Sequence, residues 1–441
     1  MIRKLRLINF KNFSDVELTL GPLTILIGTN ASGKSNLRDA FRFLHGISRG
    51  YLLSDIIGVK YGAGGNLEWQ GIRGGPLEAT YQKALTFAIS IDFDIDFEGQ
   101  SKKASYSIEV EPGSSPSLKS RVVSESLYFG REMIFDSNPN KEPLTQEDDQ
   151  HLAVRIIPGG NYRRGHLEKF ISNQPVLTQI EEKSIKPRLE NGRDQSAKKA
   201  RQIINQCIST LSPMRFLDLS PDAMRLPSLP GQTVLGDRGE NLSSVLQAIY
   251  EDKLGKLILT EWIKELTPMD AKDFEFPSDL TGKILVNLVE ENGQRTSAYS
   301  ASDGTLRFLA IIAALIGPDH ACFYFFEELE NGIHPTRIHL LMGLIEQRVG
   351  QNGLQIVTTT HSPQLLRIIK PESLKYASLI YRLSGKTDAK IRRLVDFPEP
   401  AQGVIFKNDL AQLYESGWFE DVVNFLEGDE EEPMKKGEET R

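Results

Sequence analysis

The sequence predicts an α/β protein with a β-rich N-terminal lobe, a mixed parallel-sheet core and a helical insertion. Three observations carry this prediction. An apolar run, residues 23–27, leads through a glycine-containing loop into an amphipathic stretch at 34–44. Residues 87–97 alternate strictly between apolar and polar side chains, which is the pattern of a strand with one buried face. Towards the C-terminus, strand and helix patterns alternate as in parallel sheets with crossover helices.

The N-terminal elements are predicted mostly as strands. Residues 5–20, LRLINFKNFSDVELTL, read as two short alternating strands around a polar turn. Further along, FAISIDFDIDF, SYSIEVE and SLYFG continue the strand signals. Asp92, Asp94 and Asp96 mimic a metal-binding motif, but strict alternation places them on the solvent face of one strand. Residues 1–135 are therefore expected to form one N-terminal lobe around the strand-loop-helix unit.

The pattern changes after residue 135. From 136 to 279, turn-rich polar pieces alternate with helical segments such as LSSVLQAIYEDKLGKLILTEWIKEL, which predicts a mostly helical insertion or lid. From 280 to 425, the segments KILVNLVE, TLRFLAIIAALI, ACFYFF, TRIHLLMGLIEQ and LQIVTTT alternate between strand and helix and predict a C-terminal lobe. Residues 426–441 are charged and lack apolar anchors, so we expect a disordered tail.

Composition limits the function classes. The 441 residues carry a formal net charge of -7, so overall charge does not predict nucleic-acid binding, although such a sum hides a local basic groove. Two cysteines, Cys207 and Cys322, provide neither a disulfide framework nor a paired-cysteine metal site, which fits a cytoplasmic protein. The N-terminus lacks the apolar segment of a signal peptide, and FLAIIAALIG is about half a membrane span. Secretion and membrane insertion are not expected.

The segment GTNASGKS, Gly28 to Ser35, has the spacing of a phosphate-binding loop and lies between an apolar strand and an amphipathic helix, as that motif requires. Main-chain N–H groups and the helix N-terminus surround phosphate oxygens, and Gly28 and Gly33 permit their close approach. Lys34 neutralises phosphate charge, and the Ser35 hydroxyl can ligate Mg²⁺. A chance match is the competing interpretation, and the context disfavours it. ATP and Mg²⁺ are the predicted cofactors.

Two glutamates follow a buried-looking strand in CFYFFEELENGIHP, Cys322 to Pro335. In a chain with a phosphate loop, this placement predicts that Glu327 holds the Mg²⁺ shell and that Glu328 is the general base for the attacking water. Alternatively, the two acids simply solvate the end of a strand. The combination with the phosphate loop favours the catalytic interpretation.

These motifs together resemble the ABC-type P-loop ATPase heads of the RecF, SMC and OLD (overcoming lysogenization defect) group. LINFKNF before LTILIGTNASGKSNLRDAFRFL is similar to their N-terminal lobe, EELENGIHP to their DEPENGLHP, and YSASDGTLRFLAIIAAL to their signature segment. The chain departs from this pattern at Thr29 and Ala31, at Glu327 in place of aspartate, and at Leu329 in place of proline. The extra methylene of Glu327 moves its carboxylate roughly 1.5 Å outward, so we expect slow turnover.

The resemblance implies roles for further residues around the phosphate loop. It places Asn30 at the phosphate region and the neighbourhood of Lys11 near the nucleotide. Gln70 lies where a Q-loop residue belongs, although a surface glutamine is an equal alternative. Ser35 and Glu327 are the implied metal ligands. The nucleotide-binding residues are predicted to be Gly28, Asn30, Gly33, Lys34, Ser35 and Asn36.

The resemblance also implies a second half of the site. Ser302, Asp303 and Gly304 would form the signature loop, which in such heads faces the γ-phosphate held by the other protomer. Ser302 also reads as a plain helix N-cap, and the two roles are compatible. His361, directly after LQIVTTT, resembles the switch histidine that senses γ-phosphate, with a structural histidine as the alternative. His334 is equally compatible with loop packing.

The function implied by the resemblance is an ATPase that sandwiches ATP between two chains, as a homodimer or higher homo-oligomer. Residues 136–277 show no sustained heptads, so we expect no long SMC-like arm, and we expect no Toprim nuclease domain in the stretch after His361. The resemblance implies a role in prokaryotic anti-phage defence or genome maintenance, with a separately encoded effector such as a nuclease. Two alternatives stay open: an ATP-bound scaffold with negligible hydrolysis, and a DNA-structure-binding repair ATPase of RecF type. The basic pieces RRGH at 163–166 and 183–201 could contact nucleic acid or form a solvated lid.

Overall fold

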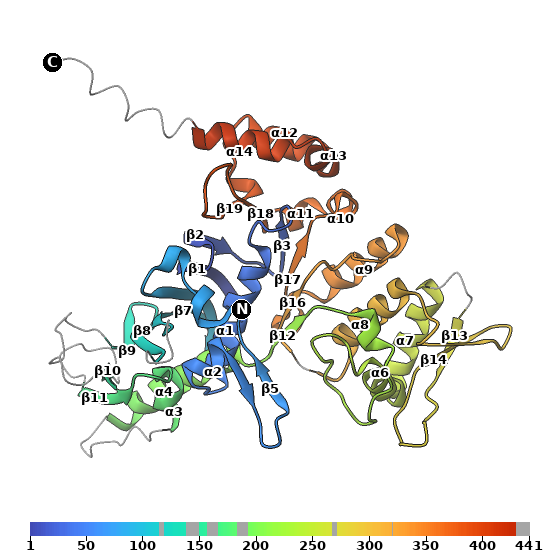
Figure 1. Ribbon diagram of the computed structural model, residues 1–441, viewed down its shortest axis with the longest axis horizontal. Coiled ribbons are helices and arrows are strands. Elements are labelled where there is room, and N and C mark those ends of the chain that lie inside the picture. The colour runs from blue at the N-terminus through green and yellow to red at the C-terminus, as the bar shows by residue number, and fades with distance from the viewer. Residues whose placement is uncertain are drawn as a thin grey trace. The chain divides into compact units, whose positions relative to one another are not determined.

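The chain forms two compact units in a computed structural model (Figure 1). Unit 1 comprises Met1–Met214 and Lys375–Val404, together with the described residues from Gly417 on, and unit 2 comprises Arg215–Leu374 and Ile405–Ser416. Each unit buries large aromatic side chains of its own. The structure describes residues 1–113, 119–137, 150–156, 166–182, 193–266, 271–319 and 321–428.

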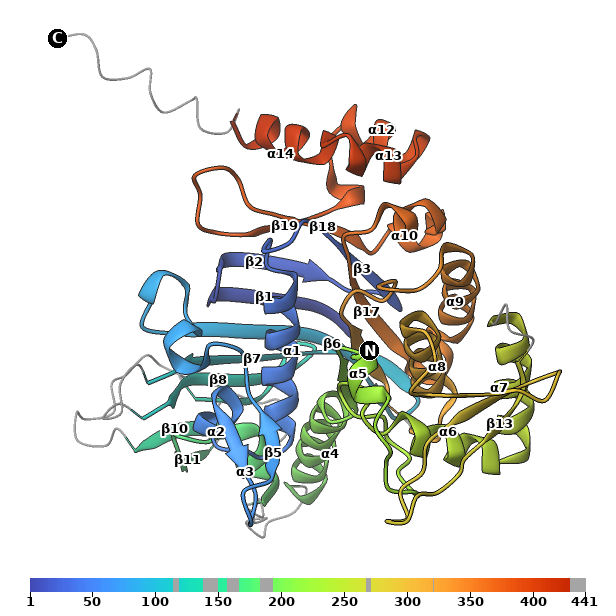
Figure 2. The same ribbon diagram turned by 45° about the vertical axis from the view of Figure 1, so that its right-hand side comes forward.

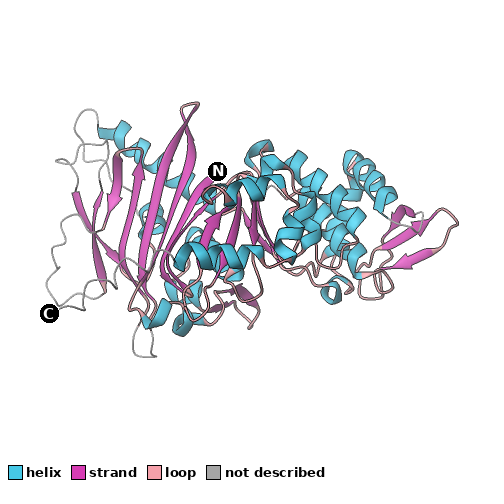
Figure 3. Ribbon diagram, turned by 90° about the horizontal axis from the view of Figure 1, so that it is seen from above, coloured by secondary structure: helices cyan, strands magenta, loops and turns pink. Residues whose placement is uncertain are grey.

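The largest sheet of unit 1 is antiparallel (Figure 3). Among the described residues it has eight strands in the order β11-β10-β9-β8-β7-β6-β1-β2. The long strands β6 and β7 pair from Phe87 opposite Val110 to Phe97 opposite Gln100. The strand bounds are β1 (Ile2–Phe10), β2 (Phe13–Thr19), β6 (Phe87–Phe97), β7 (Gln100–Glu111), β8 (Arg121–Phe129), β9 (Glu132–Asp136), β10 (His151–Ile156) and β11 (His166–Ile171).

Strand β6 has one buried face and one polar face, as its alternating sequence predicts. Phe87 and Phe93 are buried, together with the isoleucines between them. On the opposite face, Asp92 pairs with Lys103 at 2.9 Å, and Asp94 pairs with Arg3. The predicted alternation is confirmed, and these two aspartates have cationic partners on neighbouring strands.

Helices α1 (Lys34–Ser48), α3 (Val176–Glu182) and α4 (Arg193–Leu211) pack on unit 1's large sheet (Figure 2). Phe43 of α1 contacts Phe87 of β6 edge to face, with ring centroids 5.4 Å apart. The His45 Nδ1 of α1 lies 3.0 Å from the Leu211 carbonyl oxygen of α4. Helix α1 is therefore held from both sides, which fixes the loop at its N-terminus.

Glu125 anchors α3 to the sheet from inside the core. Its carboxylate accepts hydrogen bonds from the main-chain N–H groups of Val176 at 2.6 Å and Leu177 at 2.8 Å. It also accepts one from the Tyr106 hydroxyl at 2.9 Å. Burial raises the pKa of Glu125 from 4.5 to about 7, although these three donors act in the opposite direction.

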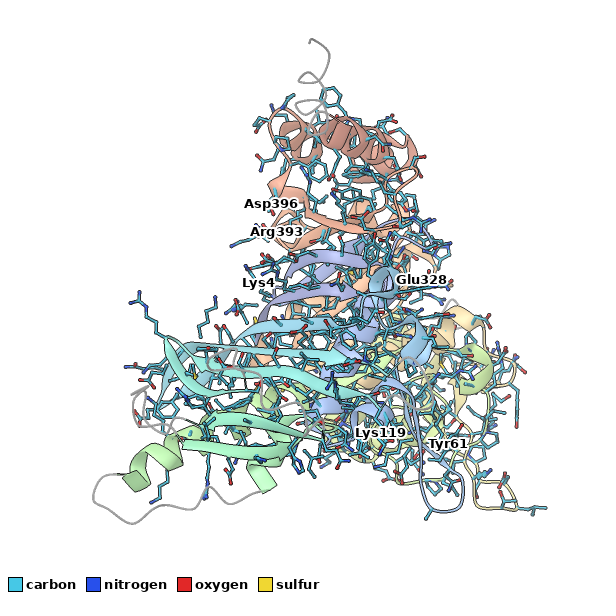
Figure 4. All side chains as sticks on the ribbon, turned by 60° about the vertical axis from the view of Figure 1, so that its left-hand side comes forward. Lys4, Tyr61, Lys119, Glu328, Arg393 and Asp396 are labelled. Carbon is cyan, nitrogen blue, oxygen red and sulfur yellow. The ribbon has the colours of Figure 1, made fainter. Side chains whose placement is uncertain are left out.

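Unit 1 contains a second group of strands, in which β3 (Leu23–Ile27) pairs in parallel with β18 (Ala377–Tyr381), and β18 pairs antiparallel with β19 (Lys390–Arg393). The C-terminal helix α14 (Trp418–Gly428) is tied to these strands by Glu427, which accepts from the Tyr381 hydroxyl at 2.6 Å and pairs with Lys390 at 2.8 Å. Arg393 pairs with Asp396 at 2.7 Å just after β19 (Figure 4). The smaller elements are α2 (Leu53–Ile57) and the hairpin β4 (Val59–Tyr61) and β5 (Leu67–Gln70).

Unit 2 has a parallel core and a small antiparallel sheet. Strands β16 (Phe323–Phe326) and β17 (Gln355–Thr360) are parallel neighbours, and β12 (Met214–Leu217) lies beside β16. The small sheet has the order β13 (Ala271–Glu275), β14 (Asn287–Glu290) and β15 (Arg295–Ser297). The helices are α5 (Pro221–Met224), α6 (Leu242–Glu251), α7 (Lys253–Leu266), α8 (Asp303–Ile316), α9 (Pro335–Arg348), α10 (Pro363–Ile368), α11 (Pro371–Leu374) and α13 (Leu410–Glu415), and α12 (Ala401–Lys407) precedes α13.

The compact units do not follow the predicted lobe boundaries at 135 and 279. The expectation of a mostly helical insertion is wrong for β10 and β11, because both continue the large sheet of unit 1 by pairing with β9 and with each other. The strand within KILVNLVE also belongs elsewhere than predicted. The Asn292-Gly293 turn folds it back onto β15 in the antiparallel sheet, so it is no part of the parallel core.

Two further predictions concern the ends of segments. The predicted continuous helix after residue 241 is broken at Asp252, whose ψ of 132° is extended, so it forms α6 and α7. Residues 426–428 lie in α14, and the rest of the predicted tail lies outside the described residues, as do 163–165 and 183–192 of the basic pieces. In the part of the chain that the structure describes, no helix is both long and apolar enough to cross a membrane.

Candidate functional site

The phosphate loop joins β3 to α1 in unit 1. All of β3 is buried, whereas Thr29, Asn30 and Ala31 of the loop are exposed. The Asn36 N–H donates to the Gly33 carbonyl oxygen at 2.9 Å, so the loop passes directly into the first helical turn. An exposed loop between a buried strand and a helix N-terminus presents its N–H groups to solvent, where a phosphate can reach them.

Gly28 and Gly33 occupy positions that have no room for a side chain. A Cβ on Gly28 would lie 2.4 Å from the Ile380 carbonyl oxygen of β18. A Cβ on Gly33 would lie 2.7 Å from Asn12 Nδ2, and the φ of Gly33 is +117°. Both glycines are therefore required by the packing of unit 1 itself, and they leave the loop backbone open to a close ligand.

Ala31 occupies the position where the family pattern has glycine. Its backbone conformation shows why glycine is favoured at this position. Its φ is 64°, which is the left-handed region. A residue with a Cβ adopts this region at a cost of roughly 1–2 kcal/mol. The loop therefore keeps the backbone shape that glycine would allow, although alanine makes this shape less favourable.

Lys34 is buried and is held by the loop. Its Nζ donates to the carbonyl oxygens of Gly28 at 2.5 Å and Thr29 at 2.7 Å. Ser35 and Asn36 are half-buried in the first turn of α1. An ammonium group, a hydroxyl and the N–H groups of one loop are a donor set that fits a nucleoside triphosphate with Mg²⁺.

The turn between β1 and β2 supports the phosphate loop through a residue that sequence reasoning missed. Asn12 Nδ2 donates to the Ser32 carbonyl oxygen at 3.4 Å, and its Oδ1 accepts from Asn36 Nδ2 at 2.7 Å. The side chain of Asn12 thus bridges the loop and the helix that follows it. The only sequence signal is its place in a polar turn, which gives no hint of this contact.

Asp39 is a second residue that sequence reasoning missed. This carboxylate on α1 is 1% exposed, and it pairs with Lys11 at 3.0 Å and with Arg73 at 3.1 Å. Arg73 Nη2 also donates to Asn36 Oδ1 at 3.4 Å. A buried carboxylate needs such partners. The network places Lys11 beside the helix of the phosphate loop, while its approach to a nucleotide stays a prediction.

Gln70 is exposed at the end of β5. Its main-chain carbonyl oxygen accepts a hydrogen bond from Arg42 Nη1 of α1 at 3.1 Å. This bond attaches the β4–β5 hairpin to the helix of the phosphate loop. A Q-loop role for Gln70 stays a prediction.

The two glutamates lie directly after β16 in unit 2. Because β16 and β17 are parallel, with Phe326 opposite Thr358, the residues that follow both strands share one edge. Glu327 donates its main-chain N–H to the Leu217 carbonyl oxygen of β12 at 3.1 Å. Glu328 has a φ of 49°, and its N–H donates to Thr359 Oγ1 at 3.0 Å. A non-glycine residue in this conformation is strained, and here a hydrogen bond to β17 helps to hold it.

The carboxylate of Glu328 has two side-chain partners. His361 Nδ1 lies 3.1 Å from Oε1, and Asn331 Nδ2 donates to Oε2 at 3.3 Å. The side chains of Glu328 and His361 are 34% and 42% exposed, so water can reach both. Figure 4 marks the position of Glu328. The structure thus brings the predicted general base and the predicted switch histidine together within one unit.

Glu330 lies beneath this pair and was not among the predicted residues. It is 6% exposed, and its Oε1 accepts a hydrogen bond from Thr360 Oγ1 at 2.6 Å. The same hydroxyl accepts the N–H of Ser362 at 3.0 Å. Burial raises the pKa of Glu330, and the negative charge of Glu328 acts in the same direction. Glu330 therefore links the loop after β16 to the residues that flank His361.

The predicted signature loop opens helix α8. Ser302 Oγ accepts the Thr305 N–H at 3.2 Å, so the predicted N-cap is confirmed. Ser302 and Asp303 are exposed, whereas Gly304 is buried. A Cβ on Gly304 would lie 2.3 Å from the Gly332 carbonyl oxygen, so the start of α8 packs directly on the loop that follows Glu328. His334 is the N-cap residue of α9, and its Nδ1 lies 2.9 Å from Thr336 Oγ1.

A family model spans the segments that contain both groups of residues. The model described as "AAA domain, putative AbiEii toxin, Type IV TA system" matches residues 23–367. This range begins at β3, before the phosphate loop, and extends beyond His361. The chain belongs to this AAA domain family.

Two curated relatives agree with this membership of the AAA domain family. An ATP/GTP phosphatase from Helicobacter pylori is 21% identical over 386 residues, which cover 84% of this chain and 87% of that protein. The DNA replication and repair protein RecF from Brucella abortus is 50% identical over 44 residues, which cover 10% of this chain and 12% of RecF. The chain thus spans most of the phosphatase but only a short part of RecF. The predicted α/β P-loop ATPase fold is confirmed, and the short match to RecF agrees with the predicted resemblance.

Solved structures with a similar fold include two SMC heads. An SMC head bound to the C-winged helix domain of ScpA has 14% identity and a TM-score of 0.44, covering 89% of this chain and 97% of that one. The SMC head domain from Thermotoga maritima has 12% identity and a TM-score of 0.39, covering 89% and 98% respectively.

Proposed function

We propose that this chain binds ATP with Mg²⁺, closes into a homodimer around the nucleotide and hydrolyses it slowly. The observation that carries the proposal is the carboxylate of Glu328, which follows a buried strand and is held by His361 and Asn331. In a member of the AAA domain family with an intact phosphate loop, this carboxylate fits a general base for an attacking water.

Each residue has a defined task in this proposal. Lys34 and the loop N–H groups bind and orient the phosphates. Ser35 and Glu327 would hold Mg²⁺, whose chemistry is to neutralise charge on the β- and γ-phosphates. Glu328 takes the proton of the water, and His361 keeps the carboxylate oriented. A left-handed Glu328 fixed through Thr359 limits the conformations that the base can adopt.

The decisive experiment substitutes Glu328→Gln, which keeps the shape of the side chain but removes its basicity. We expect kcat for ATP to fall by about 10²–10⁴, with ATP affinity unchanged within a few-fold. Glu275→Gln is the matched control, because Glu275 pairs with Arg295 on the small sheet of unit 2. Undiminished hydrolysis in Glu328→Gln would show that the base has been misassigned.

The homodimer would be completed by Ser302, Asp303 and Gly304 of the second chain. The exposure of Ser302 and Asp303 at the N-terminus of a 14-residue helix supports this role, since such an end attracts anions. Analytical ultracentrifugation of Glu328→Gln with and without ATP tests it. We expect a monomer without nucleotide and a dimer with ATP and Mg²⁺.

A dimer controlled by ATP would act as a switch for a separately encoded effector, such as a nuclease, in anti-phage defence or genome maintenance. The description of the family, which names a toxin–antitoxin system, is compatible with such a partner. Copurification of the tagged chain with the products of neighbouring genes, in ATP and in ADP, tests this part. We expect a partner whose recovery differs at least several-fold between the two nucleotides.

The alternatives each have one observation in their favour. Glu327 in place of aspartate supports a scaffold that keeps ATP bound with negligible hydrolysis, and restoration of turnover by Glu327→Asp would support that interpretation. The short stretch shared with RecF supports a DNA-structure-binding repair ATPase. That alternative requires DNA affinity that falls steeply with salt and changes with ATP.

A further inference from the structure

Arg225, just after α5 in unit 2, holds both sides of the predicted signature residue Ser302. Its Nη2 donates to the Ala301 carbonyl oxygen at 3.1 Å and to Asp303 Oδ1 at 2.6 Å. Its Nη1 donates to Asp222 Oδ1 at 3.3 Å. The Arg225 guanidinium thus contacts both the residue before Ser302 and the residue after it. Almost eighty positions separate Arg225 from these two residues in the sequence.

The negative charge of Asp303 would repel a phosphate, and Arg225 neutralises that charge. The Asp303 side chain is 63% exposed at the N-terminus of α8, where the proposed function places the γ-phosphate of a second chain. A carboxylate and a phosphate repel each other, and near a protein surface unit charges a few ångströms apart change binding by more than tenfold. A guanidinium bonded to the same carboxylate cancels its charge and leaves the helix N-terminus attractive to anions.

We propose that Arg225 is a positioning residue for the signature loop, which fixes Ala301 and Asp303 around Ser302 and neutralises Asp303 toward the nucleotide of the partner chain. This inference rests on the proposed ATP-bridged dimer. It also assigns a role to Asp303 that the sequence alone does not predict. The Asp303 carboxylate accepts the hydrogen bond through which Arg225 holds the loop.

The role of Arg225 is separable from the folding of α8. The Ser302 cap on Thr305 and the packing of Gly304 on Gly332 do not involve Arg225. The ion pair is partly exposed, and such pairs contribute little to global stability. Removing the guanidinium should therefore change the charge and orientation of the loop much more than the stability of unit 2.

The experiment measures the dimer dissociation constant with ATP and Mg²⁺ in the Glu328→Gln background, by analytical ultracentrifugation. We expect Arg225→Met to raise it about tenfold or more, while the ATP affinity of the monomer stays within twofold. Arg225→Lys, which keeps the charge, should stay within about threefold of the parent. Adding Asp303→Asn to Arg225→Met should restore most of the loss, because the unneutralised charge is gone.

Arg295→Met is the matched control, since Arg295 forms an exposed bidentate pair with Glu275 in the same unit. It should leave dimerisation unchanged. A change below twofold in Arg225→Met, or no restoration by Asp303→Asn, overturns the proposal. A fall of more than about 10 °C in the melting temperature of Arg225→Met also overturns it, because the residue would then be structural. If the parent forms no dimer with ATP, the proposed function itself fails, and this inference fails with it.

Discussion

The phosphate loop of unit 1 and the carboxylate loop of unit 2 begin alike but are held differently. Each follows a fully buried strand, and each places a non-glycine residue in the left-handed region, Ala31 at a φ of 64° and Glu328 at 49°. In unit 1 the groups proposed to bind phosphate belong mainly to the backbone, and Lys34 is held by carbonyl oxygens of the loop itself. In unit 2 the proposed general base is the Glu328 side chain, which His361 and Asn331 hold.

This difference explains why the sequence predicts the phosphate loop more completely than the carboxylate loop. A loop built from its own backbone needs glycines at fixed spacing, and that requirement is visible as a motif. The Glu328 carboxylate is held by His361 and Asn331, and the Glu328 main-chain N–H by the Thr359 hydroxyl of another strand. These are tertiary contacts, so the sequence shows only that the glutamate follows a strand. The buried carboxylates of both units likewise depend on tertiary contacts, because Glu125 accepts hydrogen bonds from Val176, Leu177 and Tyr106, and Glu330 accepts one from Thr360.

The largest effect is expected from removing the Lys34 side chain of the phosphate loop. Lys34→Ala should weaken ATP binding about 10²-fold or more, because losing one partner of a buried, hydrogen-bonded charge pair costs about 2–5 kcal/mol. Isothermal titration with ATP and Mg²⁺ measures it. Lys103→Ala, which removes an exposed lysine paired with Asp92, is the control. ATP affinity within threefold of wild type in Lys34→Ala would mean that the backbone alone holds the phosphates.

The next largest effect concerns Glu125. Its pKa is raised by burial from 4.5 to about 7, so the folded state holds the proton more tightly than the unfolded state. The free energy of unfolding should therefore fall as pH rises through this window, by ~3 kcal/mol in total. Glu125→Gln should lose this pH dependence and be the more stable form at pH 8. Urea unfolding at pH 5, 6, 7 and 8 tests this, with Glu109→Gln on β7 as the control. Equal slopes in wild type and Glu125→Gln would contradict it.

The sequence predicts best the elements that form through interactions between residues close together in the chain. The β3-loop-α1 unit, the alternation of β6 and the cap at Ser302 each depend on neighbouring residues. Strands β10 and β11 were missed because each is short and its pairing depends on β9 and on the other. Asn12, Asp39 and Arg225 were missed because their partners are distant in sequence. Polar residues in turns and on helices are common, so only the folded contact distinguishes these from the rest.

The pair of Glu328 with His361 tests whether side-chain contacts really hold the carboxylate loop. His361→Ala should lower kcat about 10–100-fold, as expected when one hydrogen bond to a charged group, about 1.5–3 kcal/mol, is lost. His361→Gln, which can still donate, should recover part of that loss. Steady-state ATP hydrolysis measures both, with His339→Ala, an exposed histidine of α9, as the control. If His361→Ala turns over as fast as wild type, Asn331 and Thr359 suffice to orient the base.

The smallest effect is expected at Ala31, and it tests whether both loops are strained in the same way. Ala31→Gly relieves a left-handed φ without touching any side-chain contact, so the loop should be more often in its binding shape, by ~1 kcal/mol. ATP should then bind about fivefold more tightly, with kcat unchanged. Glu328→Gly offers no equivalent test, because it would also remove the carboxylate that we propose as the general base. Ala63→Gly, at an exposed position between β4 and β5, controls for the general effect of an added glycine. An ATP affinity of Ala31→Gly equal to or weaker than wild type would mean that the extra freedom of glycine in the free loop outweighs the strain that it removes.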